Sequence, residues 1–262
     1  MEAINRFFIE DGHLDSIKNF NDNDSGKDKI IYEVMRVIEG KALFLREHLQ
    51  RMEKSFKLMG KNFSYEYEKI GEYVEKVILA NDKKDGNLKI TFNIDKDEMK
   101  VFYIKHSYPT NDMYRDGVKT ILYHGERKNT NAKIIDSDFR AKVNKKIKNE
   151  NAFEAILIDK NGFITEGSKS NIFLIKGDKL VTSKVEEVLP GVTRSKIIKK
   201  CKESGIKFEE SNIKYNDLEE FDAMFISGTS PGILPISQVD NIPMDVKNKL
   251  MRRIIELYNE YI

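Results

Sequence analysis

The sequence predicts an α+β fold in two domains. Stretches typical of strands and of helices are interspersed along its 262 residues, a length that suits one large domain or two modest ones. A polar segment with a proline and no periodicity, His106–Asp116, separates a first part from a second. We therefore expect a smaller N-terminal α/β domain at residues 1–107, an interdomain linker at 108–116 and a larger C-terminal domain at 117–262.

The expected N-terminal domain mixes strands and helices. Ile30–Ile38 is rich in β-branched and aromatic residues, which predicts a strand. Leu45–Met59 carries apolar residues every three to four positions, which predicts one buried helical face, and a second helix is expected at Tyr65–Ala80. Leu88–Ile94 and Lys100–Ile104 are separated by a short charged turn and predict a hairpin.

The expected C-terminal domain alternates between the two element types. Strands are predicted at Val118–Tyr123, Ala155–Ile158, Asn171–Ile175, Ala223–Ser227 and Ile233–Val239. Helices are predicted at Ser137–Asn149, Thr193–Ser204 and Val246–Tyr261. Gly205 follows the second of these helices, where glycine is a favoured C-terminal cap.

Composition excludes several classes of function. The 45 basic and 43 acidic residues nearly cancel and are interspersed, which argues against nucleic acid as a partner. No run approaches the roughly 20 apolar residues of a membrane helix, and the N-terminus lacks a signal-peptide pattern. The single cysteine, Cys201, excludes an intrachain disulfide and fits a reducing compartment. We expect a soluble cytoplasmic protein, without a membrane partner or a metal site.

The most informative stretch runs from Ile164 to Arg194. Glu166 ends an apolar run, a small polar cluster follows, and a Leu-Pro-Gly turn then opens a helix at Val192 and Thr193. Free N–H groups at a helix start favour a phosphate. A carboxylate held nearby suits a cation such as a protonated ring nitrogen. The stretch therefore predicts a site for a compact molecule that has both a phosphate and a basic ring.

Three ordered blocks extend this pattern. They are Glu166-Gly167-Ser168 with Ser170-Asn171-Ile172-Phe173, Leu189-Pro190-Gly191-Val192-Thr193-Arg194, and Gly228-Thr229-Ser230 with Pro235-Ile236. Together they resemble the signature of class IV aminotransferases, the fold-type IV pyridoxal-phosphate enzymes, which include branched-chain and D-amino acid aminotransferases and aminodeoxychorismate lyase. The resemblance implies a two-domain fold like that of D-amino acid aminotransferase, with pyridoxal 5'-phosphate bound in the C-terminal domain. It also implies a homodimer that acts on an amino acid and a 2-oxo acid.

The same resemblance assigns the residues that hold the cofactor. Lys133 matches the lysine that forms the Schiff base, although the chain has many ordinary solvated lysines. Glu166 matches the partner of the pyridine nitrogen, and Leu189 matches the apolar residue that packs on the ring. Arg51 matches an arginine that contacts the phosphate, while the solvated side of an amphipathic helix also accounts for it. The remaining phosphate contacts are expected from Val192, Thr193 and Thr229.

Substrate-binding residues match less completely. Tyr32 and Glu33 resemble a Tyr-Glu pair that lines the substrate pocket, although a half-buried strand explains both. Ser230 lies in a turn that receives the substrate carboxylate in some members of the family, but Pro231 removes one backbone donor from that turn. The strand Leu88–Ile94 is not followed by the basic residue that commonly binds a substrate carboxylate. The cofactor machinery therefore matches the family, whereas the substrate machinery differs from it.

A hydrolase motif is present but incomplete. Residues 228–232 satisfy the G-x-S-x-G pattern after an apolar strand, as a nucleophile elbow requires. That mechanism needs a histidine after the serine, and all four histidines precede it. Pro231 also lacks the N–H that forms half of the oxyanion hole. The motif therefore does not indicate a hydrolase.

Three functions stay open at this point. The first is transamination, in which Lys133 moves the α-proton of the substrate. The second is a lyase reaction of the 4-amino-4-deoxychorismate type, which uses the same lysine and glutamate. The third is a cofactor-holding protein that has lost turnover, which the missing basic residue and Pro231 favour.

Overall fold

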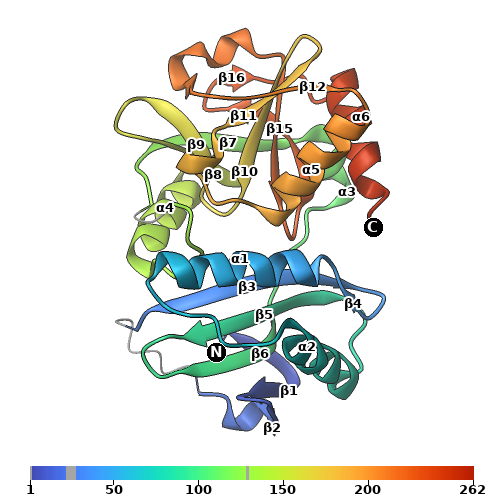
Figure 1. The fold of residues 1–262 in the computed structure, drawn as a ribbon. Coiled ribbons are helices and arrows are strands. Elements are labelled where there is room, and N and C mark those ends of the chain that lie inside the picture. The colour runs from blue at the N-terminus through green and yellow to red at the C-terminus, as the bar shows by residue number, and fades with distance from the viewer. Residues whose placement is uncertain (1, 22–27, 128–129) are drawn as a thin grey trace. The chain divides into compact units, whose positions relative to one another are not determined.

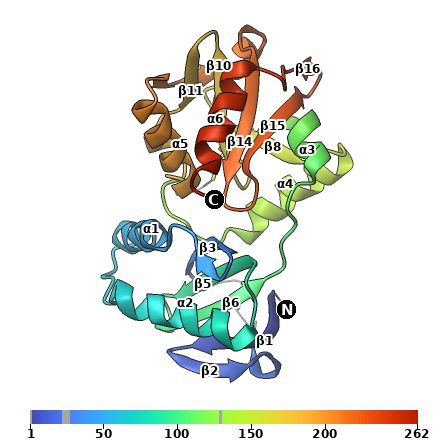
Figure 2. The same ribbon diagram turned by 90° about the vertical axis from the view of Figure 1, so that its right-hand side faces the viewer.

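The computed structural model describes residues 2–21, 28–127 and 130–262. The fold is α+β, as predicted, and the chain divides into two compact units (Figures 1 and 2). Unit 1 comprises Met1–Ser107 and Ala132–Ile135, and unit 2 comprises Tyr108–Asn131 and Asp136–Ile262. Each unit has its own sheet and its own apolar core, so each is described by itself.

Unit 1 is built on a six-stranded antiparallel sheet with the order β2-β1-β6-β5-β3-β4. Its strands are β1 (Ala3–Glu10), β2 (His13–Ser16), β3 (Ile30–Ile38), β4 (Lys41–Ala42), β5 (Gly86–Asn93) and β6 (Glu98–Ile104). The predicted strand and hairpin are confirmed, whereas β1 and β2 were not predicted.

Helices α1 (Leu45–Leu58) and α2 (Tyr67–Asn81) confirm the two predicted helices. They pack on one face of the sheet (Figure 2), where Leu49 and Met52 of α1 meet Met35 of β3 in a buried cluster. Because side chains alternate along a strand, this packing turns Ile31, Glu33 and Met35 toward the helices and Tyr32 toward the opposite face.

The segment Ala132–Ile135 adds a short antiparallel partner to β3, on the edge that β5 does not occupy. Ile134 pairs with Ile31 in an isolated bridge. The Tyr32 N–H donates to the Lys133 carbonyl over 3.1 Å, and the Ile135 N–H donates to the Ile30 carbonyl over 3.2 Å. The Lys133 N–H donates to the Ser55 hydroxyl of α1 over 3.1 Å. Both backbone groups of Lys133 are thereby held within unit 1.

Unit 2 is built on a mixed ten-stranded sheet, in the order β12-β11-β10-β14-β15-β7-β8-β9-β13 with β16 paired to β15. Its strands are β7 (Val118–His124), β8 (Glu154–Ile158), β9 (Phe163–Gly167), β10 (Asn171–Lys176), β11 (Lys179–Ser183), β12 (Lys207–Ser211), β13 (Ile213–Lys214), β14 (Ala223–Gly228), β15 (Gly232–Val239) and β16 (Ile242–Pro243). The five strands predicted here are all present.

The helices of unit 2 are α3 (Asn111–Asp116), α4 (Ser137–Asn149), α5 (Val192–Glu203) and α6 (Lys249–Asn259). Helices α5 and α6 share one buried cluster with the stacked rings of Phe173 and Phe225 from β10 and β14. Val143 of α4 packs with Ile121 and Leu157 of β7 and β8 in another. No helix of the described ranges is long and apolar enough to cross a membrane.

The segment 108–116 differs from the linker expected there. It belongs to unit 2 and contains α3, whose first turn is capped because the Thr110 hydroxyl accepts from the Met113 N–H over 3.3 Å. Arg252 of α6 donates to the carbonyls of Tyr114 and Arg115 at the other end of the helix, over 2.9 Å and 2.8 Å. The polar composition concealed this helix, because α3 is fixed by a cap and a distant arginine rather than by apolar periodicity.

We expect Ser55→Ala to loosen the backbone at Lys133. The substitution removes the acceptor of the Lys133 N–H at a fully buried position, and an unsatisfied buried donor costs about 1–3 kcal/mol. Hydrogen–deuterium exchange of a peptide that covers Ala132–Ile135 should therefore accelerate. The exposed Ser64→Ala is the matched control and should leave this exchange unchanged. Equal exchange in both variants contradicts the anchoring role.

Candidate active site

A buried ion-pair cluster joins β3 to α1 in unit 1. The Arg51 Nε donates to Glu33 Oε1 over 2.8 Å, and the Arg51 Nη2 donates to Glu33 Oε2 over 2.6 Å. The His48 Nδ1 lies 2.7 Å from Glu33 Oε2, and because an ionised carboxylate only accepts, the Nδ1 carries the proton. Glu33 is fully buried, so the fork of Arg51 compensates a charge that has no contact with water.

The surroundings set the protonation states of this cluster. Burial by itself would raise the pKa of Glu33, but the Arg51 guanidinium and the hydrogen bonds from Arg51 and His48 outweigh it and lower the pKa to about 2. Burial lowers the pKa of His48 below its ordinary 6.5, against the opposing effect of Glu33. At neutral pH the cluster therefore holds an ionised carboxylate, a cationic guanidinium and a neutral imidazole.

Tyr32 and Lys133 lie close together in the same unit. The Lys133 Nζ is 5.1 Å from the centre of the Tyr32 ring, within the range of a cation–π contact. Tyr32 is itself buried. Of the four predicted site residues of unit 1, Lys133 therefore lies against Tyr32 on one face of the sheet, while Glu33 and Arg51 form an ion pair on the other.

In unit 2, Glu166 of β9 is a buried carboxylate with a fixed orientation. The Arg127 Nε donates to its Oε1 over 2.8 Å, and the Leu189 N–H donates to its Oε2 over 2.9 Å. Arg127 is held in turn, because its Nη2 donates to the Thr130 carbonyl over 2.7 Å. Both carboxylate oxygens of Glu166 are thus engaged from different directions, which fixes the orientation of the carboxylate.

The polar residues that follow Glu166 are hydrogen-bonded to a neighbouring carboxylate. Glu154 of β8 accepts from the Ser168 hydroxyl over 2.5 Å and from the Ser170 hydroxyl over 3.0 Å. It also accepts from the Ser168 and Lys169 N–H groups. A side chain at Gly167 would meet the Ser170 hydroxyl at 2.1 Å. Glycine and the two serines therefore form a tight turn on Glu154, which holds the end of the strand that carries Glu166.

The Leu-Pro-Gly block places the start of α5 beside Glu166. The Asn171 Nδ2 donates to the Leu189 carbonyl over 2.9 Å, and its Oδ1 would lie 2.0 Å from any Cβ at position 191. The φ of Gly191, −62°, is open to every residue. The close approach of Asn171, rather than the backbone conformation, therefore requires glycine at this position. Val192 and Thr193 are buried in the first turn of α5, where the described residues supply no side-chain cap. Such a turn is suited to an anion.

Thr229 and Ser230 lie in the turn between β14 and β15 and are half-buried. This turn lies next to the polar turn on Glu154, because Ser227 of β14 pairs with Asn171 at the start of β10. The Tyr114 hydroxyl donates to the Pro231 carbonyl over 2.9 Å, which fixes the far side of the turn. Unit 2 thus holds the six other predicted residues, Glu166, Leu189, Val192, Thr193, Thr229 and Ser230. Three residues that were not predicted hydrogen-bond to residues of the two units described above, namely His48 in unit 1 and Arg127 and Glu154 in unit 2.

Comparisons with known proteins establish the family. The profile for "Amino-transferase class IV" matches residues 30–239. A D-alanine aminotransferase of Bacillus licheniformis is 27% identical over 223 residues, which covers 80% of this chain and 78% of the relative. A putative branched-chain-amino-acid aminotransferase of Methanocaldococcus jannaschii is 28% identical over 226 residues, with coverage of 80% and 78%. The chain belongs to the class IV aminotransferase family.

A solved structure shares the fold. The branched-chain aminotransferase of the thermophilic archaeon Thermoproteus uzoniensis, solved with norvaline, gives a TM-score of 0.86 at 22% identity, and the match covers 98% of this chain and 94% of that one. The two-domain fold of type IV predicted from the three sequence blocks is therefore confirmed.

We expect Glu33→Gln to destabilise unit 1 in a pH-dependent manner. The lowered pKa of Glu33, about 2 against an ordinary 4.5, corresponds to about 3 kcal/mol of stabilisation. Because the folded-state pKa is the lower one, this stabilisation is complete above about pH 5 and is lost as the pH falls toward 2. Hydrogen exchange of β3 and α1 amides should therefore report a large gap in the free energy of unfolding between wild type and variant at pH 7.

That gap should shrink by about 2 kcal/mol at pH 3, where most of the wild-type carboxylate's advantage is lost. Glu68→Gln, an exposed position on α2, is the control and should follow wild type at both pH values. A gap independent of pH contradicts an ionised Glu33.

We expect Gly191→Ala to disturb the start of α5 by about 1–3 kcal/mol. The new methyl group collides with the Asn171 amide and displaces its hydrogen bond to the Leu189 carbonyl. A lower thermal midpoint is the measured result. Gly71→Ala in α2 is the matched substitution, with no atom closer than 3.9 Å to the added carbon, and should raise the midpoint. Equal midpoints for Gly191→Ala and wild type contradict the close approach.

Proposed function

We propose that this chain is a pyridoxal-phosphate-dependent aminotransferase that moves an amino group between an amino acid, of the branched-chain or D-amino acid type, and a 2-oxo acid. The observation that carries the proposal is the arrangement around Glu166 in unit 2. A buried carboxylate oriented by Arg127 and by the Leu189 N–H lies beside the uncapped start of α5. One small ligand with a protonated ring nitrogen and a phosphate satisfies both features.

The residues present fit the cofactor. Glu166 would accept from the ring nitrogen and keep it protonated, while the half-buried Leu189 would pack on the ring. The N–H groups of Val192 and Thr193 and the hydroxyls of Thr193 and Thr229 would hold the phosphate. When bound, the cofactor supplies an aldehyde that captures the substrate amine and a ring that withdraws electrons from the carbon next to it.

Arg51 keeps its proposed contact with the phosphate. Its guanidinium carries five N–H donors in a planar fork, and Glu33 accepts from Nε and Nη2. The ion pair therefore fixes the plane of the fork. In this proposal Glu33 orients Arg51 and does not contact the substrate directly.

Lys133 is proposed to hold the cofactor covalently and to carry the proton. Its Nζ would take the proton from the α-carbon of the substrate and return it to the product. A lysine can do this only when its amine is unprotonated for part of the cycle. The backbone bonds of Lys133 to Tyr32 and Ser55 limit the motion of its side chain to the butyl stem.

The family and the composition support a proposal for the partner and the cellular context. We propose a homodimer in the cytoplasm, with neither nucleic acid nor membrane as a partner. The single cysteine supports a reducing compartment. Aminotransfer is proposed over the lyase reaction because the curated relatives that match this chain are aminotransferases of D-alanine and of branched-chain amino acids.

We expect Lys133→Met to abolish aminotransfer and covalent capture of the cofactor. Borohydride reduction of wild type with pyridoxal phosphate, followed by peptide mapping, should label Lys133. The variant should lose the label and the yellow absorption band. Lys160→Met, at an exposed turn, is the control and should keep both. A label on a different lysine overturns the assignment.

The reaction type is tested with the wild-type protein. Glutamate formed from 2-oxoglutarate and a panel of L- and D-amino acids supports aminotransfer and identifies the handedness of the substrate. Pyruvate formed from aminodeoxychorismate, without glutamate in the first assay, supports the lyase instead.

A further inference from the structure

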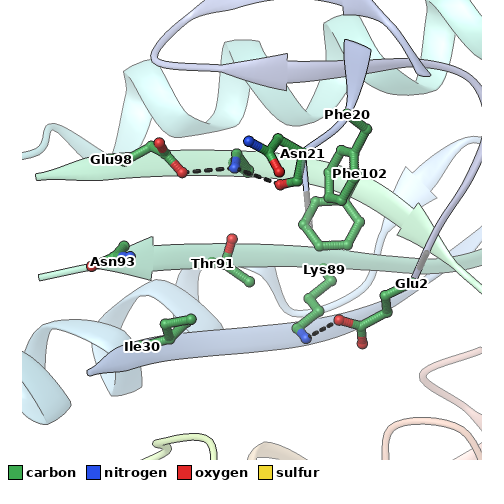
Figure 3. A pocket seen from close by; sticks show the side chains of 10 residues that line it. Glu2, Phe20, Asn21, Ile30, Lys89, Thr91, Asn93, Glu98 and Phe102 are labelled. Carbon is green, nitrogen blue, oxygen red and sulfur yellow. Dashed lines mark hydrogen bonds and ion pairs between the residues drawn. The ribbon is translucent and has the colours of Figure 1, made fainter. Parts of the chain in front are cut away.

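The face of the unit 1 sheet opposite the helices carries a pocket (Figure 3). Two buried lysines, Lys89 of β5 and Lys100 of β6, lie in it. The pocket is lined by Glu2, Phe20, Asn21, Ile30, Lys89, Thr91, Asn93, Glu98, Lys100 and Phe102. A sheet face with two buried ammonium groups needs an account, because a buried charge is costly unless it is paired.

Lys100 is fully compensated within the pocket. Its Nζ lies 2.7 Å from a Glu98 oxygen and 3.1 Å from a Glu10 oxygen. It also donates to the Asn21 carbonyl over 3.1 Å. Two carboxylates and a carbonyl therefore use the three donors of this ammonium group, and the charge of Lys100 is balanced by residues of unit 1.

Lys89 is compensated differently. Its Nζ lies 2.5 Å from a Glu2 oxygen (Figure 3), and Glu2 is the one carboxylate that pairs with it among the described residues. The remaining contacts of this ammonium are the faces of two rings, Tyr32 at 5.1 Å and Phe102 at 6.0 Å from the ring centres. The side chain of Lys89 is 5% exposed, whereas that of Glu2 is 44% exposed. The buried cation thus depends on a carboxylate that is itself partly exposed to water.

The Tyr32 ring connects Lys89 to the candidate active site. Lys133 Nζ and Lys89 Nζ each lie 5.1 Å from the centre of this ring. In the register of β3 and β5, Tyr32 pairs with Thr91 and Val34 pairs with Lys89, so Tyr32 and Lys89 are diagonal neighbours on one face of the sheet. One amine is proposed to react with the cofactor, and the other stands one aromatic ring away.

We propose that Lys89 binds the carboxylate of the amino acid and of the 2-oxo acid, and that the substrate carboxylate takes the place of Glu2. This assignment rests on the proposed aminotransfer, since such substrates carry a carboxylate on the carbon next to the reacting amine. Exchange of one carboxylate for another leaves the charge around Lys89 unchanged. Glu2 can return to water when it is displaced, because its side chain is already 44% exposed in the pair.

The assignment also accounts for the missing basic residue after β5. The chain has Asn93-Ile94-Asp95 where a basic residue was expected after the strand. Lys89 of β5 instead places a cation on the sheet face that carries Tyr32. An ammonium is a point charge with rotatable donors. Lys89 therefore holds a carboxylate without imposing the fixed plane that an arginine fork requires, and Tyr32 covers one side of the pair.

Four variants of the holoenzyme test the proposal by isothermal titration with propionate, a carboxylate that has no amine to transfer. Lys89→Met should weaken propionate binding at least about tenfold, as expected for loss of a charge-assisted contact. Lys89→Arg should retain most of the affinity. Lys100→Met is the matched control, a buried lysine of the same pocket, and should leave propionate affinity unchanged.

Glu2→Gln separates binding from a structural role. Both Glu2→Gln and Lys89→Met break the same ion pair, so a purely structural pair predicts that both weaken binding or that neither does. The proposal predicts opposite signs, because Glu2→Gln removes the competitor of the substrate and should tighten propionate binding. Steady-state assays should follow the same pattern, with KM for the amino acid raised about tenfold in Lys89→Met and kcat changed much less.

The outcomes distinguish this proposal from the function on which it rests. Aminotransfer with an unchanged KM and an unchanged propionate affinity in Lys89→Met overturns the Lys89 assignment and leaves the aminotransferase standing. Propionate binding that depends on Lys89, in a protein that transfers no amino group, supports the carboxylate site and contradicts the proposed reaction. Equal losses in Lys89→Met and Glu2→Gln show that the pair only stabilises the fold.

Discussion

The position of Lys133 depends on one constraint, the backbone pairing of Ala132–Ile135 with the edge of β3. A lysine side chain has four rotatable bonds, so the position of its amine is defined only if its own backbone is fixed. Here the N–H and the carbonyl of Lys133 are both bound, to Ser55 and Tyr32. The same strand then separates two environments by its period of two. Glu33 faces α1 and its buried arginine, while Tyr32 faces the lysines.

In unit 2, most of the sequence signature maintains the geometry around Glu166 rather than contacting a ligand. Gly167 admits the Ser170 hydroxyl, and both serines of the turn are bound by Glu154. Gly191 admits the Asn171 amide, which holds the Leu189 carbonyl. Leu189 in turn donates its N–H to Glu166. The small and polar residues of the blocks are thus explained by steric fit and hydrogen bonding, which leaves few groups for chemistry.

The sequence was sufficient to predict the helices and strands that have a periodic pattern. It was insufficient where contacts with residues distant in the sequence determine the structure. The strand Ile30–Ile38 and the helix Ser137–Asn149 were predicted to the residue. Strand β1 was missed because polar Asn5 and Arg6 interrupt it, at a bulge that Asn81 of α2 stabilises by accepting from two of its N–H groups. Arg127 lies in a charged stretch, GERKNT, where nothing local separates it from its neighbours. His48 could have been found, since it lies one helical turn before Arg51 on the same face.

The choice between arginine and lysine follows the task of each buried pair. Glu33 and Glu166 are each paired with an arginine, Arg51 or Arg127, and Arg127 is itself held by the Thr130 carbonyl. A planar fork gives such pairs a fixed geometry. Lys89 pairs with Glu2 through a single oxygen and has no fork to align. An ammonium accepts a replacement carboxylate from many directions, so a pair that must open and close in each catalytic cycle is better built from lysine. Lysine alone does not mark exchange, since Lys100 is held by two carboxylates and a carbonyl. The Lys89 pair differs because it depends on a single, partly exposed carboxylate.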